Sequence, residues 1–327
     1  MTATIATFYS VGGGVGRTTL LLSVAYAIRK ILDKKVAVID LDLEAPTLYA
    51  YTKDPEETIR KLEHEARSAV ELAFWLEKPD KNRDVFDLRV GDASIPALLQ
   101  SPLAARTLGY KGIVALEDVQ YQWSRVETVP ARRRWLRQLA ERFAEVEGAD
   151  MILIDSRSGL GSIGVDALAA ADIAVVPAPL DSISIERTVR VLIGIGTHLR
   201  DVTSNVWLKN IVIAAARHPP SECHAERMRE ELRIKIIGRL LSTGKGIEFG
   251  SPAALHPGPC IPFVEDMARV GAKPLGLVAE KCPKRWGGQG SQDQDSGGKG
   301  GDSMSAYCSA LSKLATMIIT RGRRETG

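Results

Sequence analysis

A glycine-rich run near the N-terminus has the residue types that a phosphate chain requires. Residues 12–19 read G-G-G-V-G-R-T-T. Glycines let the backbone approach phosphate oxygens and turn its N–H groups toward them, a cation neutralises charge, and a hydroxyl can ligate Mg²⁺. The run supplies all of these if Arg17 takes the place of the usual lysine. A tight strand-to-helix turn without a ligand is the alternative.

The run departs from the standard phosphate-loop pattern G-x-x-x-x-G-K-[ST] at two positions. Val11 stands where the pattern has its first glycine, and Arg17 stands where it has lysine. The interpretation of this run as a phosphate-binding loop therefore depends on the elements that flank it.

The flanking segments predict a strand, a loop, a helix and a second strand in that order. Residues 4–9 are β-branched and aromatic, residues 18–32 carry apolar side chains at helical spacing, and residues 36–39 are a continuous apolar run that ends at Asp40. This is one βαβ unit, with polar residues at the carboxyl end of its second strand.

The same alternation continues along the chain. Apolar runs predict strands at 151–154, closed by Asp155, and at 173–176 and 211–216, and helices are predicted from Asp54 to about Leu76 and over 132–146. The expected fold is α/β, a doubly wound and mostly parallel sheet flanked by helices, with ligands at the carboxyl ends of the strands.

Three further segments complete the expected organisation. Residues 1–280 form the main domain, within which 78–130 is a variable insert that has no clear pattern beyond an apolar run at 114–116, where a further strand is expected. Residues 287–303 are glycine-rich and predict a flexible segment. Residues 304–327 combine an amphipathic helix with a basic tail, and we expect the helix to pack on the core rather than on a membrane or a nucleic acid.

Composition narrows the class of protein. The 327 residues are 45% hydrophobic and 25% charged, as in a globular chain with a large core, and the net charge of +3 is too small to indicate a nucleic-acid or membrane partner. No apolar run reaches the roughly 18 residues of a membrane span. The arginines at 132–134 are expected on a solvated helix face.

The four cysteines lie far apart and lack metal-binding spacing, as do the five histidines. We therefore expect free thiols in a reducing compartment, no metal on these residues, and a cytoplasmic location.

An ordered set of motifs resembles the ParA/MinD-type ATPases, whose deviant phosphate loop reads K-G-G-V-G-K-T-T. Besides residues 12–19, the resemblance covers I-D-L-D at 39–42, I-D-S at 154–156, A-A-D at 170–172 with V-V-P at 175–177, and I-P at 261–262 with G-A-K-P at 271–274. These motifs follow the family's order over most of residues 1–275.

The resemblance implies a role for each matching residue, with ATP and Mg²⁺ as cofactors. Asp42 orients the attacking water, and Arg17 contacts the phosphates. The remaining assignments are phosphate binding by Gly13, Gly14, Val15, Gly16 and Thr19 and magnesium binding by Thr18, Asp40 and Asp155.

Two departures from the family affect the expected activity. The family's signature lysine, which reaches the partner subunit's nucleotide, corresponds to Gly12, and Arg17 replaces a lysine whose compact charge the loop is built around. We expect slow hydrolysis by a nucleotide switch that forms a homodimer and engages a partner protein, with DNA or a membrane as weaker candidates. A catalytically inactive nucleotide-binding scaffold is the alternative.

Overall fold

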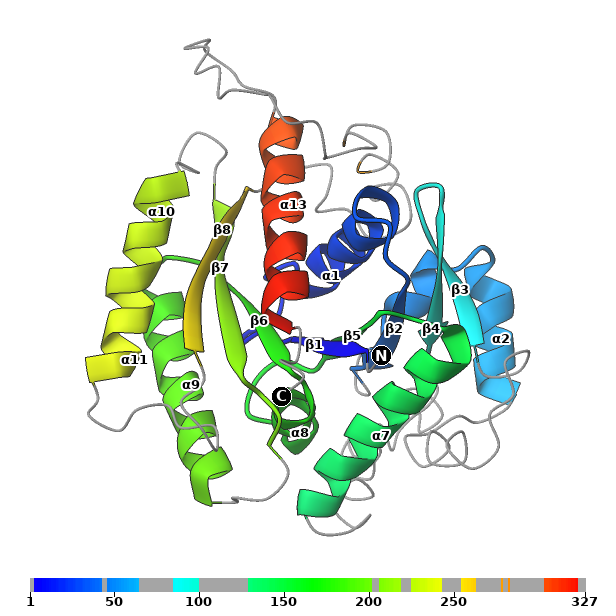
Figure 1. Ribbon diagram of the computed structural model, residues 1–327, viewed down its shortest axis with the longest axis horizontal. Helices are drawn as coiled ribbons and strands as arrows, with labels where there is room; N and C mark the ends of the chain where they lie inside the picture. Colours follow the sequence, from blue (N-terminus) through cyan, green and yellow to red (C-terminus); the bar gives the residue numbers. More distant parts are fainter. Residues whose placement is uncertain are drawn as a thin grey trace, which may run out of the picture.

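The computed structural model describes residues 3–42, 46–64, 85–99, 129–201, 206–218, 225–242, 254–262, 278, 282 and 303–322. This part of the chain forms an eight-stranded sheet with helices packed on both of its faces (Figure 1). The expected α/β fold with a mostly parallel sheet is confirmed.

The strand order is β3-β4-β2-β5-β1-β6-β7-β8, and every neighbouring pair is parallel except the antiparallel hairpin of β3 and β4. The strands are β1 (Thr4–Phe8), β2 (Val36–Leu41), β3 (Val85–Val90), β4 (Ala93–Leu98), β5 (Met151–Ser156), β6 (Ile173–Ala178), β7 (Asn210–His218) and β8 (Ala254–Pro262).

Different sets of helices cover the two faces of the sheet. The α-helices are α1 (Arg17–Tyr26), α2 (Pro55–His64), α7 (Val129–Glu147), α8 (Ser162–Ala170), α9 (Ser182–Asp201), α10 (Ala225–Leu232), α11 (Arg239–Ser242) and α13 (Ser303–Gly322). Short helices lie at η1 (Ala27–Ile31), η2 (Leu48–Tyr51) and η5 (Arg233–Gly238). Helices α1 and α13 pack on one face, and α7 to α10 pack on the other.

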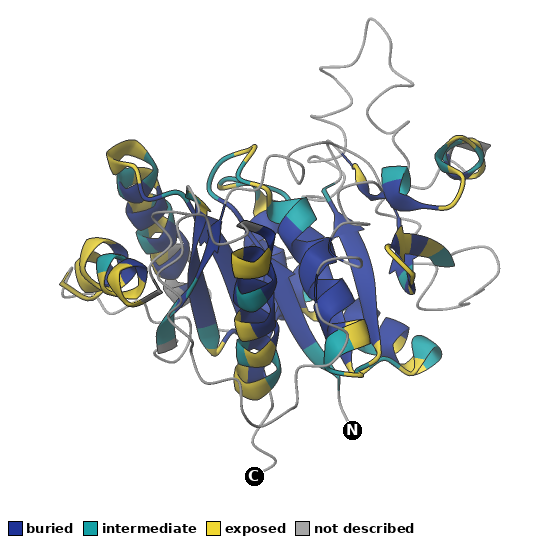
Figure 2. Ribbon diagram, turned by 90° about the horizontal axis from the view of Figure 1, so that it is seen from above, coloured by how far each residue is buried: buried dark blue, intermediate teal, exposed yellow. Residues whose placement is uncertain are grey.

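Alternating side chains of the central strand β1 show why its sequence is apolar throughout. Ala6 and Phe8 join the core under α1 and α13, whereas Ile5 joins the core under α7. Both faces are thus removed from water, and the central strands appear as fully buried in Figure 2. Continuous apolar runs, rather than alternating ones, are the expected pattern for such strands.

Two sheet elements were not predicted from the sequence. The hairpin of β3 and β4 lies inside the insert, and Pro96 within β4 obscured the strand pattern. Strand β8 contains Pro257, Gly258 and Pro259, which an edge strand tolerates because one side needs no ladder hydrogen bonds. The expected strand at 114–116, the continuation of the 54–76 helix beyond residue 64 and most of the 287–303 segment lie outside the described residues.

The C-terminal helix packs on the core, as expected. Its aligned side chains Tyr307, Leu311, Leu314 and Ile318 are all buried. The Tyr307 hydroxyl donates to Oγ of Ser23 in α1 at 3.0 Å, so the contact between the two helices includes a buried polar bond. Among the described helices, none is long and apolar enough to cross a membrane.

The expectation of free thiols was wrong. Cys282 and Cys308 form a disulfide with their Cα atoms 5.3 Å apart, and Cys260 is also disulfide-bonded. The Cys282 bond ties the segment before α13 to the helix itself. The wide sequence spacing of the cysteines concealed this pairing, because the fold brings distant residues together, and the thiol argument for a reducing compartment is removed.

The expectation of a solvated arginine face at 132–134 was also wrong for two of its three residues. Arg132 and Arg133 are buried in α7, and their Nε atoms bond to the two carboxylate oxygens of Asp166 in α8 at 2.8 and 3.1 Å. Only Arg134 is exposed. The two arginines are buried because they pair with Asp166 on the neighbouring helix. Helical periodicity cannot reveal such a partner.

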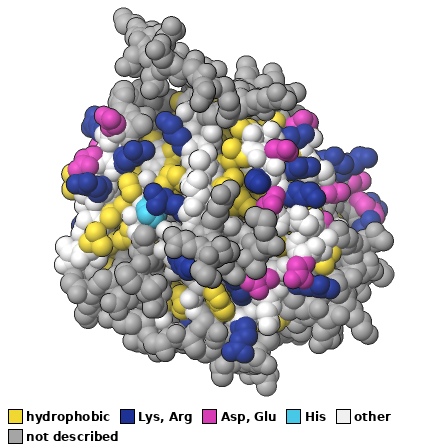
Figure 3. Space-filling model, viewed as in Figure 1, with side chains coloured by type: hydrophobic (Ala, Val, Ile, Leu, Met, Phe, Trp, Pro, Cys, Tyr) yellow, Lys and Arg dark blue, Asp and Glu magenta, His cyan; other side chains and the backbone are white. Residues whose placement is uncertain are grey.

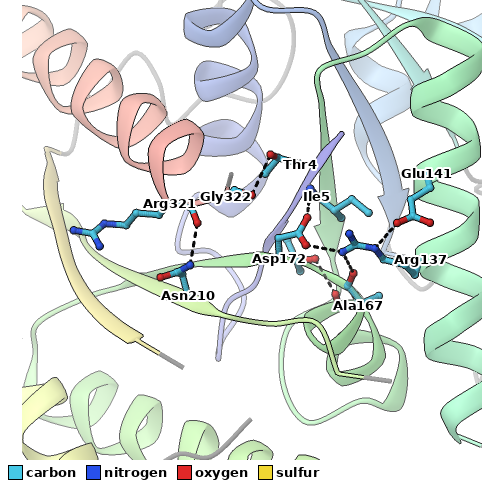
Figure 4. Close-up of polar contacts among 11 residues, drawn as sticks. Thr4, Ile5, Arg137, Glu141, Ala167, Asp172, Asn210, Arg321 and Gly322 are labelled. Atoms are coloured by element: carbon cyan, nitrogen blue, oxygen red, sulfur yellow. Dashed lines mark hydrogen bonds and ion pairs between the residues drawn. The ribbon is translucent and has the colours of Figure 1, made fainter. Parts of the chain in front are cut away.

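A third buried arginine of α7 joins this helix to the central strands (Figure 4). Arg137 Nη1 donates to Asp172 Oδ1 at 2.9 Å and to the Ala170 carbonyl at 3.0 Å, while Asp172 Oδ2 accepts the N–H of Ile5 at 2.9 Å. Burial raises the pKa of Asp172, and the charge of Arg137 opposes that shift. The Asp172 carboxylate therefore connects β1, α7 and the start of β6.

We predict that Asp172→Ala lowers the free energy of unfolding by about 3–5 kcal/mol, because it removes the buried acid that pairs with Arg137 and leaves the partly exposed Glu141 as the acid bonded to this guanidinium. The matched control is Glu145→Ala, which removes an exposed pair with Arg142 and should cost less than about 1 kcal/mol. Chemical denaturation followed by circular dichroism measures both. Equal losses in the two variants would contradict the prediction.

Candidate functional site

The register of the sheet brings two carboxylates together. Asp40 at the end of β2 is the direct partner of Asp155 at the end of β5, and Asp155 is also level with Phe8 of β1. Neighbouring strands lie about 4.8 Å apart, so these carboxyl ends form one short polar edge. The glycine-rich loop leaves β1 at this same edge.

Two glycines of the loop adopt backbone angles that other residues rarely take. Gly14 has φ +75° and Gly16 has φ +81°, and Gly16 is the residue directly before α1. Left-handed angles are strained for residues with a Cβ atom, so glycine is needed at both positions. A Cβ atom at Gly13 or Gly16 would meet nothing within 4 Å, and this side of the loop is open.

The first residue of α1 joins the loop to the strand ends. Arg17 Nε donates to Asp155 Oδ1 at 2.5 Å, and its Nη2 donates to Asp42 Oδ2 at 2.8 Å. Thr18 Oγ1 donates to the other oxygen of Asp155 at 2.7 Å. Both oxygens of the buried Asp155 are therefore occupied by the first turn of α1.

The surroundings keep Arg17 charged. Burial lowers the pKa of the Arg17 guanidinium, but the charges and hydrogen bonds of Asp155 and Asp42 outweigh it, and the net pKa is raised. Burial raises the pKa of Asp155, and Arg17 and Thr18 oppose that rise. An arginine with its two-sided fork can serve two carboxylates at once, which a lysine ammonium does with less directional control.

Asp40 is the least satisfied carboxylate of the site. Its Oδ1 accepts the N–H of Asp42 at 3.0 Å, while its buried Oδ2 has no hydrogen-bond partner. Burial, with the nearby Asp155 as the next contribution, raises its pKa well above the usual aspartate range. This unpartnered carboxylate oxygen lies on the strand next to Asp155, which Thr18 contacts, and carboxylate oxygens are the ligands that hydrated Mg²⁺ takes. Asp40, Asp155 and Thr18 therefore fit such an ion.

A residue left without a role by the sequence analysis supports the loop. Arg217 at the end of β7 donates from Nη1 to the carbonyl of Gly14 at 2.7 Å. Its own φ of +63° is unusual for a residue other than glycine. Backbone outliers of this kind are common at functional sites. In the sequence, the signal that could have identified Arg217 was its place directly after an apolar strand, like that of Asp40.

The segment after β5 is tied to the start of the loop. The hydroxyl of Tyr9 donates to the Gly159 carbonyl at 2.6 Å, and the Gly159 N–H donates to the Ser10 carbonyl at 3.1 Å. Burial raises the pKa of Tyr9, so its hydroxyl stays protonated as this bond requires. Residues 157–161 therefore lie against the loop.

The structure brings together five of the residues singled out from the sequence, namely Arg17, Thr18, Asp40, Asp42 and Asp155. Gly13, Gly14, Val15 and Gly16 lie in the loop, and Thr19 lies in the first turn of α1. Among the described residues, no group of three His, Cys, Asp or Glu side chains is placed to hold a metal ion.

Residues 3–204, more than half of the chain, match a family model described as "AAA domain". The chain belongs to this family of ParA/MinD-type P-loop ATPases. The sporulation initiation inhibitor protein Soj of Bacillus subtilis (strain 168) is 22% identical over 250 residues, which cover 75% of this chain and 87% of Soj.

Solved structures show the same fold. The pNOB8 ParA bound to nonspecific DNA is 14% identical, with a TM-score of 0.57 and coverage of 98% of both chains. Cobyrinic acid a,c-diamide synthase of Mycobacterium smegmatis, with a bound ATP analogue and magnesium, is 16% identical, with a TM-score of 0.54 and coverage of 97% of this chain and 94% of that one. The expected family resemblance is confirmed.

The raised pKa of Asp40 predicts a pH effect on stability. A carboxyl group whose pKa is higher in the folded than in the unfolded chain loses stability as the pH rises from its unfolded value, near 3.8, to its folded value. We expect nucleotide-free Asp40→Asn to be more stable than wild type at pH 7, by about 0.5–2 kcal/mol. The difference in the free energy of unfolding between this variant and wild type should become smaller as the pH falls.

Asp92 provides a control of opposite sign, because its hydrogen bond with Lys30 lowers its pKa. Asp92→Asn should therefore destabilise slightly at pH 7 and have less effect in acid. Urea unfolding across the pH range measures both variants. An Asp40→Asn protein that is less stable than wild type at pH 7 would rule out the electrostatic account of Asp40.

Proposed function

We propose that this protein is an ATP-binding, Mg²⁺-dependent ATPase that acts as a nucleotide switch. One observation carries the proposal: through Arg17 and Thr18, the first turn of α1 contacts Asp155 at the end of β5 and Asp42 directly after β2. The loop, the hydroxyl and the acids therefore meet at one edge of the sheet, as phosphoryl transfer requires.

The loop and helix α1 bind the phosphates in this proposal. The backbone N–H groups of Gly13, Gly14 and Gly16 face the phosphate oxygens, and the N-terminus of α1 adds its dipole. Thr19 bonds to the α-phosphate. Arg217 fixes the loop through the Gly14 carbonyl, so this backbone is held in place before the nucleotide arrives.

Thr18, Asp40 and Asp155 are the residues that would hold Mg²⁺, the two acids acting through water. The buried, unpartnered Oδ2 of Asp40 supports this assignment, since a bound water would satisfy it. When bound, the ion neutralises charge on the phosphates. Asp42, beside the loop and only partly buried, orients the attacking water.

Arg17 explains why hydrolysis should be slow. Its guanidinium is held by Asp155 and Asp42, so it must give up bonds to these acids before it can contact a phosphate. That exchange also frees Asp42 to hold the water. Nucleotide binding and the formation of the catalytic arrangement are thereby coupled through one side chain.

A nucleotide-binding scaffold without turnover is the second candidate. The same two ion pairs support it, because Arg17 stays out of the phosphate site as long as they persist. Gly12 adds no cation to the loop. The loop then serves to bind nucleotide and stabilise an assembly.

The proposed switch presents a surface near the loop. Leu160, one residue after the loop-bound Gly159, is 62% exposed, and Ile183 at the start of α9 is 71% exposed. Both residues follow the carboxyl ends of β5 and β6, the two strands that flank β1, and exposed apolar side chains at this edge give a partner apolar surface to bury. We propose that this edge forms a nucleotide-dependent homodimer and then engages a partner protein.

DNA is a weaker candidate partner. The pNOB8 ParA, a structural relative, was solved bound to nonspecific DNA. On the face shown in Figure 3, however, Lys and Arg side chains lie beside Asp and Glu. Exposed cations of the described residues are also paired with acids, as Arg227 and Lys235 are with Glu231. A mixed surface of this kind gives little attraction for a phosphate backbone.

Phosphate release from purified protein with ATP and Mg²⁺ distinguishes the two candidate functions. We expect Asp42→Ala to lower the rate by about 100-fold or more, because the attacking water loses its orienting acid. Glu145→Ala, on an exposed part of α7, is the control and should keep the wild-type rate. Equal background release by wild type and Asp42→Ala would favour the scaffold.

Thermal unfolding tests whether Arg17 belongs to the nucleotide site. ATP at about 100 times its dissociation constant stabilises a protein by about 2.7 kcal/mol, which raises the melting temperature by several degrees. We expect Arg17→Ala to lose this shift. Circular dichroism shows whether the variant is folded, and a folded variant that keeps the full shift would place Arg17 outside the site.

A further inference from the structure

The guanidinium group of an arginine on another helix lies beside Gly12, the first glycine of the loop. Arg187 lies near the N-terminal end of α9, and its Nη1 would be 3.6 Å from a Cβ atom built on Gly12. Helix α9 follows β6, the strand next to β1, so its beginning lies at the same carboxyl edge as the loop. The two segments are 175 residues apart in sequence but adjacent in the fold.

The Arg187 side chain makes no hydrogen bond or ion pair with the part of the chain that the structure describes, and it is exposed. Its neighbours on α9 behave differently. Glu186 pairs with Arg190 and with Arg239, so the acid beside Arg187 in sequence is already engaged by other cations. Arg187 therefore keeps its donors available at the loop.

The charges at the loop show what such a cation would do. Arg17 is engaged by Asp42 and Asp155, and the third acid, Asp40, is buried without a cation of its own. A triphosphate adds about four negative charges to an edge that already holds three carboxylates. A free guanidinium beside Gly12 reduces that repulsion.

We propose that Arg187 contacts the phosphate chain of the bound nucleotide and sets the affinity of the site for phosphates. The inference rests on the proposed function and adds a binding residue to it. The planar guanidinium donates to two phosphate oxygens at once, which a lysine cannot do with the same geometry. Gly12 leaves the space beside the loop to this side chain, because a long residue there would contact the guanidinium.

Calorimetric titration of the whole protein with ATP and Mg²⁺ tests the proposal. We expect Arg187→Ala to weaken ATP binding by about tenfold or more, as for the loss of a charge-assisted hydrogen bond, and Arg187→Lys to recover part of the loss. Arg190→Ala is the matched control, since Arg190 is exposed on the same helix and pairs with Glu186. It should bind ATP as wild type does.

Ionic strength gives a second readout that a purely structural role would not change. The gap in ATP affinity between wild type and Arg187→Ala should narrow as salt is raised, because salt screens an exposed charge. ATP affinity of Arg187→Ala within twofold of the Arg190→Ala value would overturn the inference and leave the proposed function intact. An absence of ATP binding by the wild type would overturn both.

Discussion

The pairing of buried acids at one edge of the sheet is the constraint on which the site depends. Strand register sets Asp40 beside Asp155, and neither is exposed to water that could solvate its charge. Burying charged groups is costly unless they are paired, so the first turn of α1 must supply partners. Arg17 and Thr18 do so for Asp155, and this fixes the loop relative to the strand ends, while one oxygen of Asp40 keeps no hydrogen-bond partner.

Arginine side chains pair with buried acids in two separate parts of this molecule. On the face covered by α7 and α8, buried Arg133 pairs with Asp166 and joins the two helices, and buried Arg137 pairs with Asp172 and joins α7 to the sheet. At the loop, Arg17 pairs with the strand-end acids. The first pairs lie in a closed core and serve stability, whereas Arg17 adjoins a loop that is open at Gly13 and Gly16.

The two proposed functions differ in whether the Arg17 pairs break. In a switch, phosphates attract Arg17 away from Asp42 and Asp155, and the acids change partners. The segment at residues 157–161 follows Asp155 directly and is bonded to the start of the loop through Tyr9 and Gly159. The buried Asp155 and the exposed Leu160 are therefore the two ends of one short segment that is bonded to the start of the loop.

Sequence alone determined the features that depend on local pattern and short spacing: the strand, loop and helix at residues 4–32, the strand ends at Asp40 and Asp155, the core-facing stripe of α13, and the family. Tertiary structure decided the rest, because it depends on which distant residues meet. Only the fold placed Asp166 beside the arginines of α7, joined Cys282 to Cys308, brought Arg217 to Gly14, and set Arg187 over Gly12. Sequence periodicity shows which side of a helix is buried, but chain topology determines which residues that side contacts.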